Sequence, residues 1–117
     1  MVAGLIEKAR IAQKEFEGFN QEQVDLIVRE IGKTVYDNAE YLAKMAVEET
    51  RMGVYEHKIA KNKGKSKVIW NDLKDKKSVG VISKDSVTNI IEIAKPIGVV
   101  GAVTPTTNPI VTPMCNA

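Results

Sequence analysis

The sequence is poor in the residues that form disulfides, metal sites and aromatic cores. Its 117 residues include one cysteine, one histidine and one tryptophan, and aromatic residues make up only 5%. A single cysteine excludes an internal disulfide and fits a reducing compartment, so we expect a cytoplasmic protein. Because no group of cysteine, histidine and carboxylate residues has metal-ligand spacing, no metal site is predicted. Aliphatic side chains must supply most of the core.

Strong charge imbalance and long apolar runs are also missing. The formal net charge is +2, which is too small to indicate a nucleic-acid partner by itself. No run approaches the length of a transmembrane helix. The first ten residues carry charges inside their apolar stretch, unlike a signal peptide. We therefore expect neither nucleic acid nor a membrane as a partner.

Helical periodicity dominates the first part of the chain. Apolar spacing predicts an amphipathic helix over residues 2–16 and a second helix that fades near residues 37–38. Asn20, with Gln23 three residues later, has the pattern of a capping box at the start of the second helix. Third and fourth helices are expected over residues 39–50 and 55–73, with these inward positions: Leu42, Ala46, Thr50, Tyr55, Ile59, Ile69 and Leu73.

The fourth predicted helix has a polar middle and is rich in lysine. Gly64 weakens it by roughly 1 kcal/mol relative to alanine. The favoured interpretation of the lysines is a solvated helix face, and the alternative is a site for an acidic ligand or partner, whose binding would be sensitive to salt. These basic residues are Lys61, Lys63, Lys65, Lys67, Lys74, Lys76 and Lys77.

Two β patterns follow the helices. Weak alternation over residues 78–82, turn residues at 84–86 and β-branched residues over 88–94 predict a hairpin. Residues 97–103 form an unbroken apolar run, which is typical of a parallel strand buried on both faces. Hydroxyl, amide and proline residues come directly after it, and ligands bind at the carboxyl ends of such strands.

The last residues have the pattern of a helix start, with Thr112 as the N-cap and Pro113 as the first helical residue. A parallel strand without parallel neighbours, followed by a helix start, predicts the front part of a larger α/β protein. The alternative is a small natural domain with a frayed tail.

Three stretches carry a resemblance to a known family. They are residues 94–100 (Ala-Lys-Pro-Ile-Gly-Val-Val), 104–109 (Thr-Pro-Thr-Thr-Asn-Pro) and 112–117 (Thr-Pro-Met-Cys-Asn-Ala). Together they resemble the CoA-acylating branch of the aldehyde dehydrogenase superfamily. The text upstream, including residues 35–40 and 46–50, is most similar to CoA-dependent succinate-semialdehyde dehydrogenases. The similarity covers nearly the whole chain.

The resemblance implies an α/β fold that is incomplete here: N-terminal helices, a β-hairpin, and the first strand of a dinucleotide-binding parallel sheet. The implied division of this N-terminal fragment (residues 1–117) is a helical segment over 1–77, an oligomerisation-type hairpin over 78–95, and the first strand, loop and helix start of the cofactor domain over 96–117.

The implied reaction interconverts succinyl-CoA and succinate semialdehyde, with NAD or NADP as cofactor and CoA as co-substrate. The implied partners are the small-molecule aldehyde and CoA, and the full-length protein is expected to be a homo-oligomer. The family's nucleophilic cysteine is not among these residues, so the chain alone is expected to be inactive. A non-catalytic oligomerisation or interaction module derived from this family is the alternative.

The resemblance also places site residues on the loop. In ordinary aldehyde dehydrogenases a loop asparagine stabilises the oxyanion, and the matching position here is Thr107, with Asn108 one place later. Both are candidates, and Asn108 is preferred for its two N–H donors. Plain turn chemistry is an equal alternative for Asn108. The implied lining of the nicotinamide-ribose side is Thr104, Pro105 and Thr106. Neither Cys115, interpreted as a small residue packed at a helix start, nor His57, interpreted as a surface residue, is assigned catalysis.

Overall fold

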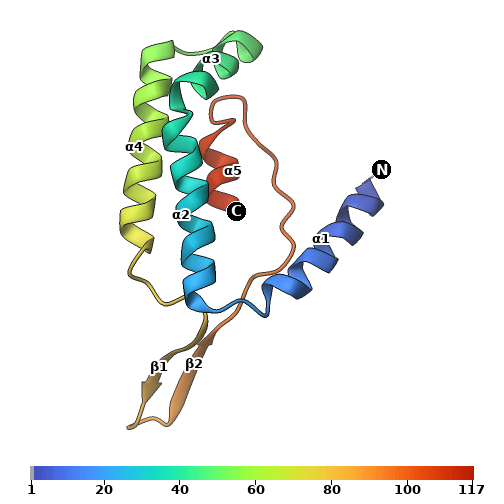
Figure 1. Cartoon of the computed structure of the whole chain (residues 1–117), viewed down its shortest axis with the longest axis vertical. Helices are drawn as coiled ribbons and strands as arrows, with labels where there is room; N and C mark the ends of the chain where they lie inside the picture. The colour runs from blue at the N-terminus through green and yellow to red at the C-terminus, as the bar shows by residue number, and fades with distance from the viewer. Residues whose placement is uncertain (1) are drawn as a thin grey trace. The chain divides into compact units, whose positions relative to one another are not determined.

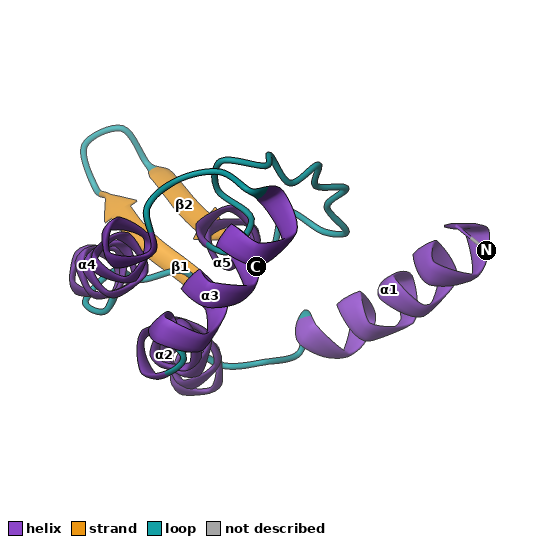
Figure 2. Cartoon of the chain, turned by 90° about the horizontal axis from the view of Figure 1, so that it is seen from above, coloured by secondary structure: helices purple, strands orange, loops and turns teal. Residues whose placement is uncertain are grey.

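The computed structural model of the protein describes residues 2–117, which form five helices and one antiparallel hairpin of two strands (Figures 1 and 2). The chain divides into two compact units. The first unit comprises the residues up to Asp25 together with Lys76–Gly101, and the second comprises Leu26–Asp75 together with Ala102–Ala117. None of the helices in residues 2–117 is both long and apolar enough to cross a membrane.

The first unit contains helix α1 (Val2–Phe16), the first turn of helix α2 (Gln21–Asp37), and the hairpin. The predicted capping box is confirmed at the start of α2. The Gln23 backbone N–H donates to Asn20 Oδ1 over 2.9 Å, and the Asn20 backbone N–H donates to Gln23 Oε1 over 3.0 Å. The two bonds satisfy backbone donors that a helix start would otherwise leave unpaired.

Gln21 joins the start of α2 to the chain that enters the hairpin. Its Oε1 accepts the backbone N–H groups of Ser78 and Val79 over 2.9 and 3.0 Å. Its Nε2 donates to Asp25 Oδ1 and to Ser78 Oγ. A groove of about 560 Å³ within this unit is lined mainly by apolar side chains, which include Phe16, Phe19, Val24, Val79 and Ile93.

The hairpin consists of β1 (Gly80–Asp85) and β2 (Ile90–Ala94), so the predicted hairpin is confirmed with its turn slightly later than expected. Val81 pairs with Ile93, and Ser83 pairs with Glu92, which leaves a bulge between Val81 and Ser83. Asp85 closes the turn, because its carboxylate accepts bonds from the Val87 backbone N–H and the Thr88 hydroxyl. These bonds lower the pKa of Asp85, with the hydroxyl of Thr88 as the largest cause.

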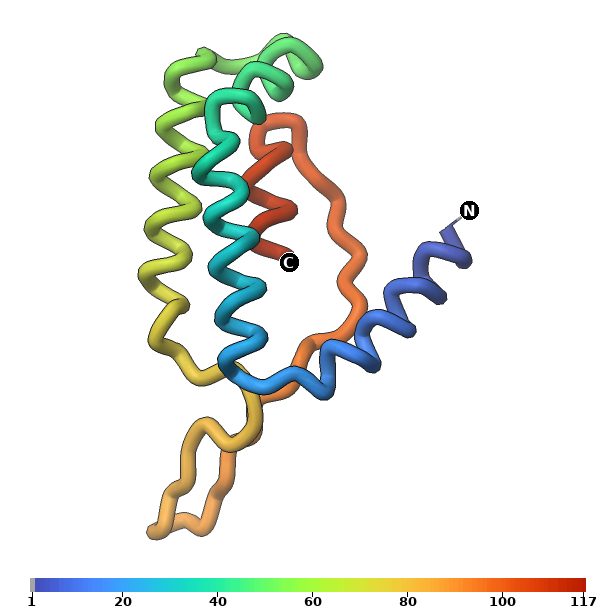
Figure 3. The backbone as a smooth tube through the Cα atoms, viewed as in Figure 1, coloured from blue at the N-terminus to red at the C-terminus, as the bar shows by residue number. Residues whose placement is uncertain are grey.

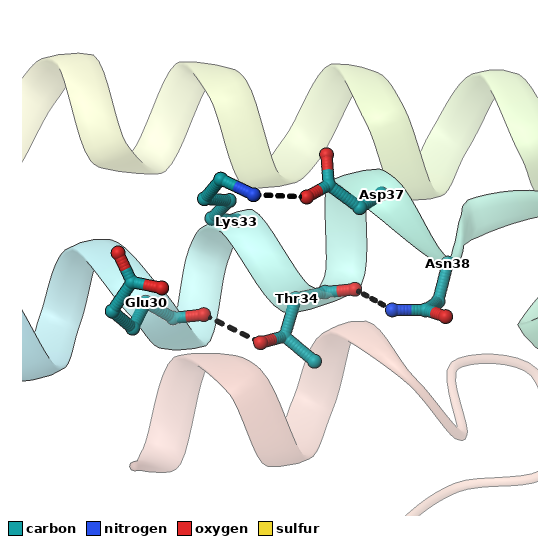
Figure 4. Close-up of polar contacts among 5 residues, drawn as sticks. All are labelled: Glu30, Lys33, Thr34, Asp37 and Asn38. Carbon is teal, nitrogen blue, oxygen red and sulfur yellow. Dashed lines mark hydrogen bonds and ion pairs between the residues drawn. The ribbon is translucent and has the colours of Figure 1, made fainter.

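The second unit is helical. The rest of α2 lies beside α4 (Tyr55–Leu73) and α5 (Val111–Asn116), with α3 (Ala39–Thr50) across one end (Figures 1 and 2). Polar contacts close the end of α2 (Figure 4). Thr34 Oγ1 donates to the Glu30 carbonyl over 2.7 Å, Asn38 Nδ2 donates to the Thr34 carbonyl over 2.9 Å, and Lys33 pairs with Asp37. Asp37 raises the pKa of Lys33 through this hydrogen bond.

Small side chains form the core between α3 and α4. Ala39 and Ala43 are fully buried, and Ala46 is almost so. On α4, Asn62 lies against α3 and Ser66 lies beside Gly32 of α2; they are 4% and 2% exposed. Both polar groups are satisfied, since Asn62 Nδ2 donates to the Ala39 carbonyl over 3.3 Å and Ser66 Oγ donates to the Asn62 carbonyl over 2.7 Å. Small residues on both sides let the two helices approach closely.

The predicted inward positions are therefore partly wrong. The bounds of α3 and α4 match the prediction, and Ala46 is buried, but Tyr55 and Leu73 are exposed. The side of α4 that meets α3 is the polar middle of the helix, because only small side chains fit against the alanines of α3. Leu42, Thr50, Ile59 and Ile69 are partly buried.

The predicted buried strand over residues 97–103 is wrong for this structure. These residues belong to neither a helix nor a strand (Figure 3), and Ile97 and Val103 are 96% and 95% exposed. A parallel strand needs a hydrogen-bonded neighbour, and within residues 2–117 the only strand pair is β1 with β2. Without a neighbour the apolar run remains unpaired. The mixed α/β class is nevertheless confirmed by the helices and the hairpin.

Candidate functional site

The candidate site is the loop of residues 104–110 with helix α5, all within the second unit. The loop is held by two backbone bonds of Asn108. Its N–H donates to the Pro105 carbonyl over 3.0 Å, and its carbonyl accepts the Thr112 N–H over 3.4 Å. The first bond closes a turn, and the second joins the turn to the beginning of α5. The turn chemistry predicted for Asn108 is therefore present.

Helix α5 begins earlier than predicted. It starts at Val111, with Ile110 at the N-cap and no side-chain cap, so Thr112 is not the capping residue. Pro113 is the third helical residue rather than the first. This position tolerates proline, because the first four N–H groups of a helix have no partner inside the helix. The helix ends at Asn116.

The predicted site residues divide into an exposed group and one partly buried residue. The side chains of Thr104, Pro105, Thr106 and Thr107 are exposed, and Asn108 is partly buried. Asn108 Oδ1 is shielded from solvent and accepts no hydrogen bond within residues 2–117, while Nδ2 makes only a long contact of 3.5 Å with Thr107 Oγ1. The two candidate oxyanion donors thus differ in burial: Thr107 is exposed, whereas Asn108 is partly buried through its amide oxygen.

Asn108 lines a small cavity that the sequence analysis did not anticipate. Its volume is about 10 Å³, and the opposite wall is formed by Ala46 of α3 and by Lys58, Lys61 and Asn62 of α4. Residues 58, 61 and 62 lie at helical spacing on one face of α4, and this spacing is the feature of the sequence that indicates a shared polar face. Nothing in the sequence, however, showed that the loop would lie against that face.

The structure bears on two residues to which the sequence analysis assigned no catalysis. His57 is exposed on α4, as expected for a surface residue. Cys115 is exposed on α5 and beside an apolar groove that Trp70 also lines, so its interpretation as a packed residue at a helix start is wrong. The described residues contain no group of histidine, cysteine and carboxylate side chains that could hold a metal ion.

Most lysines of α4 lie on a solvated helix face, which was the favoured interpretation of the sequence. Lys65 and Lys67 are exposed, and Lys63 pairs with Glu40 of α3 over 3.2 Å. Lys61 is also exposed but contributes to the cavity beside Asn108. The basic side chains therefore point to more than one side, and they do not form one focused anion site.

Comparisons with known proteins find relatives of similar sequence and structure. No protein-family profile matches the chain. A protein of Clostridium kluyveri named succinate-semialdehyde dehydrogenase (acetylating) is 61% identical over 97% of this chain and 25% of its own length. This chain is a close homologue of the N-terminal portion of acylating aldehyde dehydrogenases.

Two further aldehyde dehydrogenases are similar, one in sequence and one in both sequence and fold. A sulfoacetaldehyde dehydrogenase of Acholeplasma sp is 46% identical over 99% of this chain and 24% of its own length. The crystal structure of a probable aldehyde dehydrogenase from Listeria monocytogenes EGD-e matches with a TM-score of 0.93 at 42% identity, covering 98% of this chain and 25% of that one. The chain spans about a quarter of the length of these relatives. The resemblance and the α/β fold expected from it are confirmed.

Proposed function

We propose that this chain is the N-terminal part of an NAD(P)-dependent, CoA-acylating aldehyde dehydrogenase that interconverts succinyl-CoA and succinate semialdehyde. The observation that carries the proposal is the 61% identity to the Clostridium kluyveri protein, whose name states this aldehyde. The sulfoacetaldehyde relative is less similar, at 46%. Acylating chemistry is thus common to the homologues, and the aldehyde is the finer part of the proposal.

The chemistry of the loop is compatible with binding the cofactor. Thr104, Thr106 and Thr107 present exposed hydroxyl groups that can both donate and accept hydrogen bonds. Residues 96–117 carry no charged side chain, so no carboxylate repels a phosphate-bearing cofactor there. We propose that Thr104, Pro105 and Thr106 contact the nicotinamide-ribose side. NAD(P), when bound, takes the hydride from the aldehyde carbon, and CoA takes the acyl group.

The oxyanion role needs a donor aimed at the developing negative charge on the substrate oxygen. Thr107 and Asn108 are the two candidates of this loop. In the proposed enzyme the donor acts beside a nucleophilic cysteine that this chain does not supply. Cys115, exposed on α5, is not assigned that role.

A chimera tests the proposal. This chain replaces the homologous quarter of the Clostridium kluyveri enzyme, and NADH or NADPH formation is measured with CoA and each of three aldehydes: succinate semialdehyde, sulfoacetaldehyde and acetaldehyde. We expect turnover, with the highest kcat/KM for succinate semialdehyde. The isolated 117-residue chain is the control and should turn over none of them. A chimera that is folded by circular dichroism but inactive would refute the proposal.

A second candidate function is a non-catalytic oligomerisation or interaction module. The observation that favours it is the hairpin, whose apolar residues are largely exposed, including Val81, Ile90, Ile91 and Ile93. We propose that the hairpin contacts other subunits in a homo-oligomer whichever function applies. Size-exclusion chromatography with light scattering separates the two cases, since a monodisperse monomer that retains no full-length relative in a pull-down argues against the module.

A further inference from the structure

The amide oxygen of Asn108 is a buried acceptor without a donor, and such groups in folded proteins are rare. Leaving a buried polar group unpaired costs about 1–3 kcal/mol, so its surroundings decide what satisfies it. Asn108 Oδ1 is closed off from solvent and accepts no bond within residues 2–117. The groups that line the adjoining cavity are therefore the candidates.

Two donor-only side chains of α4 line this cavity, and the end of the Lys58 side chain lies beside Gly53. Lys58 and Lys61 line it together with Asn62, and an ammonium group offers three donors and no acceptor. The ion pairs of the described residues are Lys33–Asp37, Lys44–Glu48 and Lys63–Glu40, so neither Lys58 nor Lys61 has a carboxylate partner there. Asn62 already donates to the Ala39 carbonyl.

The size of the cavity matches a single bridging molecule. About 10 Å³ is close to the room that one water needs, and a buried water needs two to four polar partners. Asn108 Oδ1 is one such partner, and the flexible side chains of Lys58 and Lys61 can supply the others. The remaining wall is Ala46 of α3, which is apolar, and residues 96–117 add no charge of their own. The lysines are therefore the only charged groups that line the cavity within residues 2–117.

We propose that Asn108 is a positioning residue, whose amide oxygen is held by Lys58 and Lys61 across this cavity with one bridging water. The side chain then fixes the loop to α4, and the exposed Thr107 is the residue that presents a donor to the oxyanion. The role of Thr107 as oxyanion donor rests on the proposed function. The contact of Asn108 with Lys58 and Lys61, called the anchor below, concerns this chain alone.

The anchor is tested on the 117-residue chain by Asn108→Asp, which keeps an acceptor and adds a titratable group at the same place. Because two ammonium groups favour the carboxylate, we expect its pKa, followed by ¹³C NMR, to lie below the ordinary value of about 3.9. Replacing both Lys58 and Lys61 by methionine should raise that pKa, and Lys65→Met, an exposed control on the same helix, should leave it unchanged. The proposal is overturned if this pKa lies at or above the ordinary value, or if it does not change when Lys58 and Lys61 are replaced.

The positioning role is tested by kinetics in the chimera described above. Thr107→Val removes the proposed donor and should lower kcat by about 10²–10³-fold, the usual cost of losing an oxyanion donor. Asn108→Ala removes the anchor together with the amide donor, and replacing Lys58 and Lys61 by methionine removes the anchor alone, so the two changes should lower kcat by similar factors. A large loss for Asn108→Ala, with little for Thr107→Val and none for the lysine replacements, overturns the assignment. An inactive parent chimera refutes the proposed function. In that case the NMR titration still tests whether Lys58 and Lys61 hold Asn108.

Discussion

The interface between α3 and α4 allows a quantitative prediction for Ala43→Leu. Ala43 is fully buried, and Asn62 of α4, which bonds to α3, is almost fully buried too. Burying the three added carbons would gain about 2.4 kcal/mol if space existed. The cavity beside the neighbouring Ala46 is only about 10 Å³, so the helices must separate instead. Overpacking of this kind costs about 1–3 kcal/mol of unfolding free energy.

The assay is urea and thermal unfolding followed by circular dichroism at 222 nm. A loss of about 2 kcal/mol lowers Tm by roughly 8–16 °C in a unit of this size. Ala60→Leu is the matched control, because Ala60 is exposed on α4 and the change should stay within about 0.5 kcal/mol. Equal stabilities for the two variants would mean that α3 and α4 are not closely packed through their small residues, and the reasoning would be refuted.

Three further predictions concern local structure. Asn20→Ala removes the side-chain half of the capping box and should destabilise the start of α2 by about 1 kcal/mol, measured as faster amide hydrogen exchange there. Thr88→Val should raise the pKa of Asp85, which can be followed by NMR, and an unchanged pKa would contradict this prediction. Because the pKa of Asp85 is lowered in the folded chain, its stabilisation of the turn is fully present above the ordinary carboxyl pKa. This stabilisation is lost as the pH falls through the lowered pKa. Gly53→Ala should destabilise by about 1 kcal/mol in urea unfolding, because φ is +86°, a conformation that residues with a Cβ rarely adopt. Gly64→Ala, with open space around it, should instead stabilise α4.

The helices could be predicted closely from the sequence because their signals are local. Asn20 and Gln23 announce the start of α2 within four residues, and the bounds of α3 and α4 follow from apolar spacing and glycine. The inward face of α4 could not be predicted in the same way. Asn62 is buried against α3 and Ser66 is buried beside Gly32 of α2. A periodicity that counts only large apolar residues does not identify either position.

The remaining errors have non-local causes. Residues 97–103 have the composition of a buried strand, but a strand exists only where another backbone pairs with it. The same limit applies to the site. The loop residues were identified by their likeness to a family, yet which of Thr107 and Asn108 is open to a ligand depends on a cavity wall supplied by a helix about fifty residues earlier. Which distant residues lie against the loop can be seen only in the folded structure.

The unpaired apolar stretch at residues 97–103 has a practical consequence for anyone who prepares this chain. Its backbone donors and acceptors are available to a second molecule, and β-branched segments of low charge readily stack in this way. Concentrated samples should therefore become turbid through intermolecular β-structure, with thioflavin fluorescence rising in proportion. A single charged replacement at Ile97, which is 96% exposed and so has little packing to lose, is the simplest way to keep such samples clear.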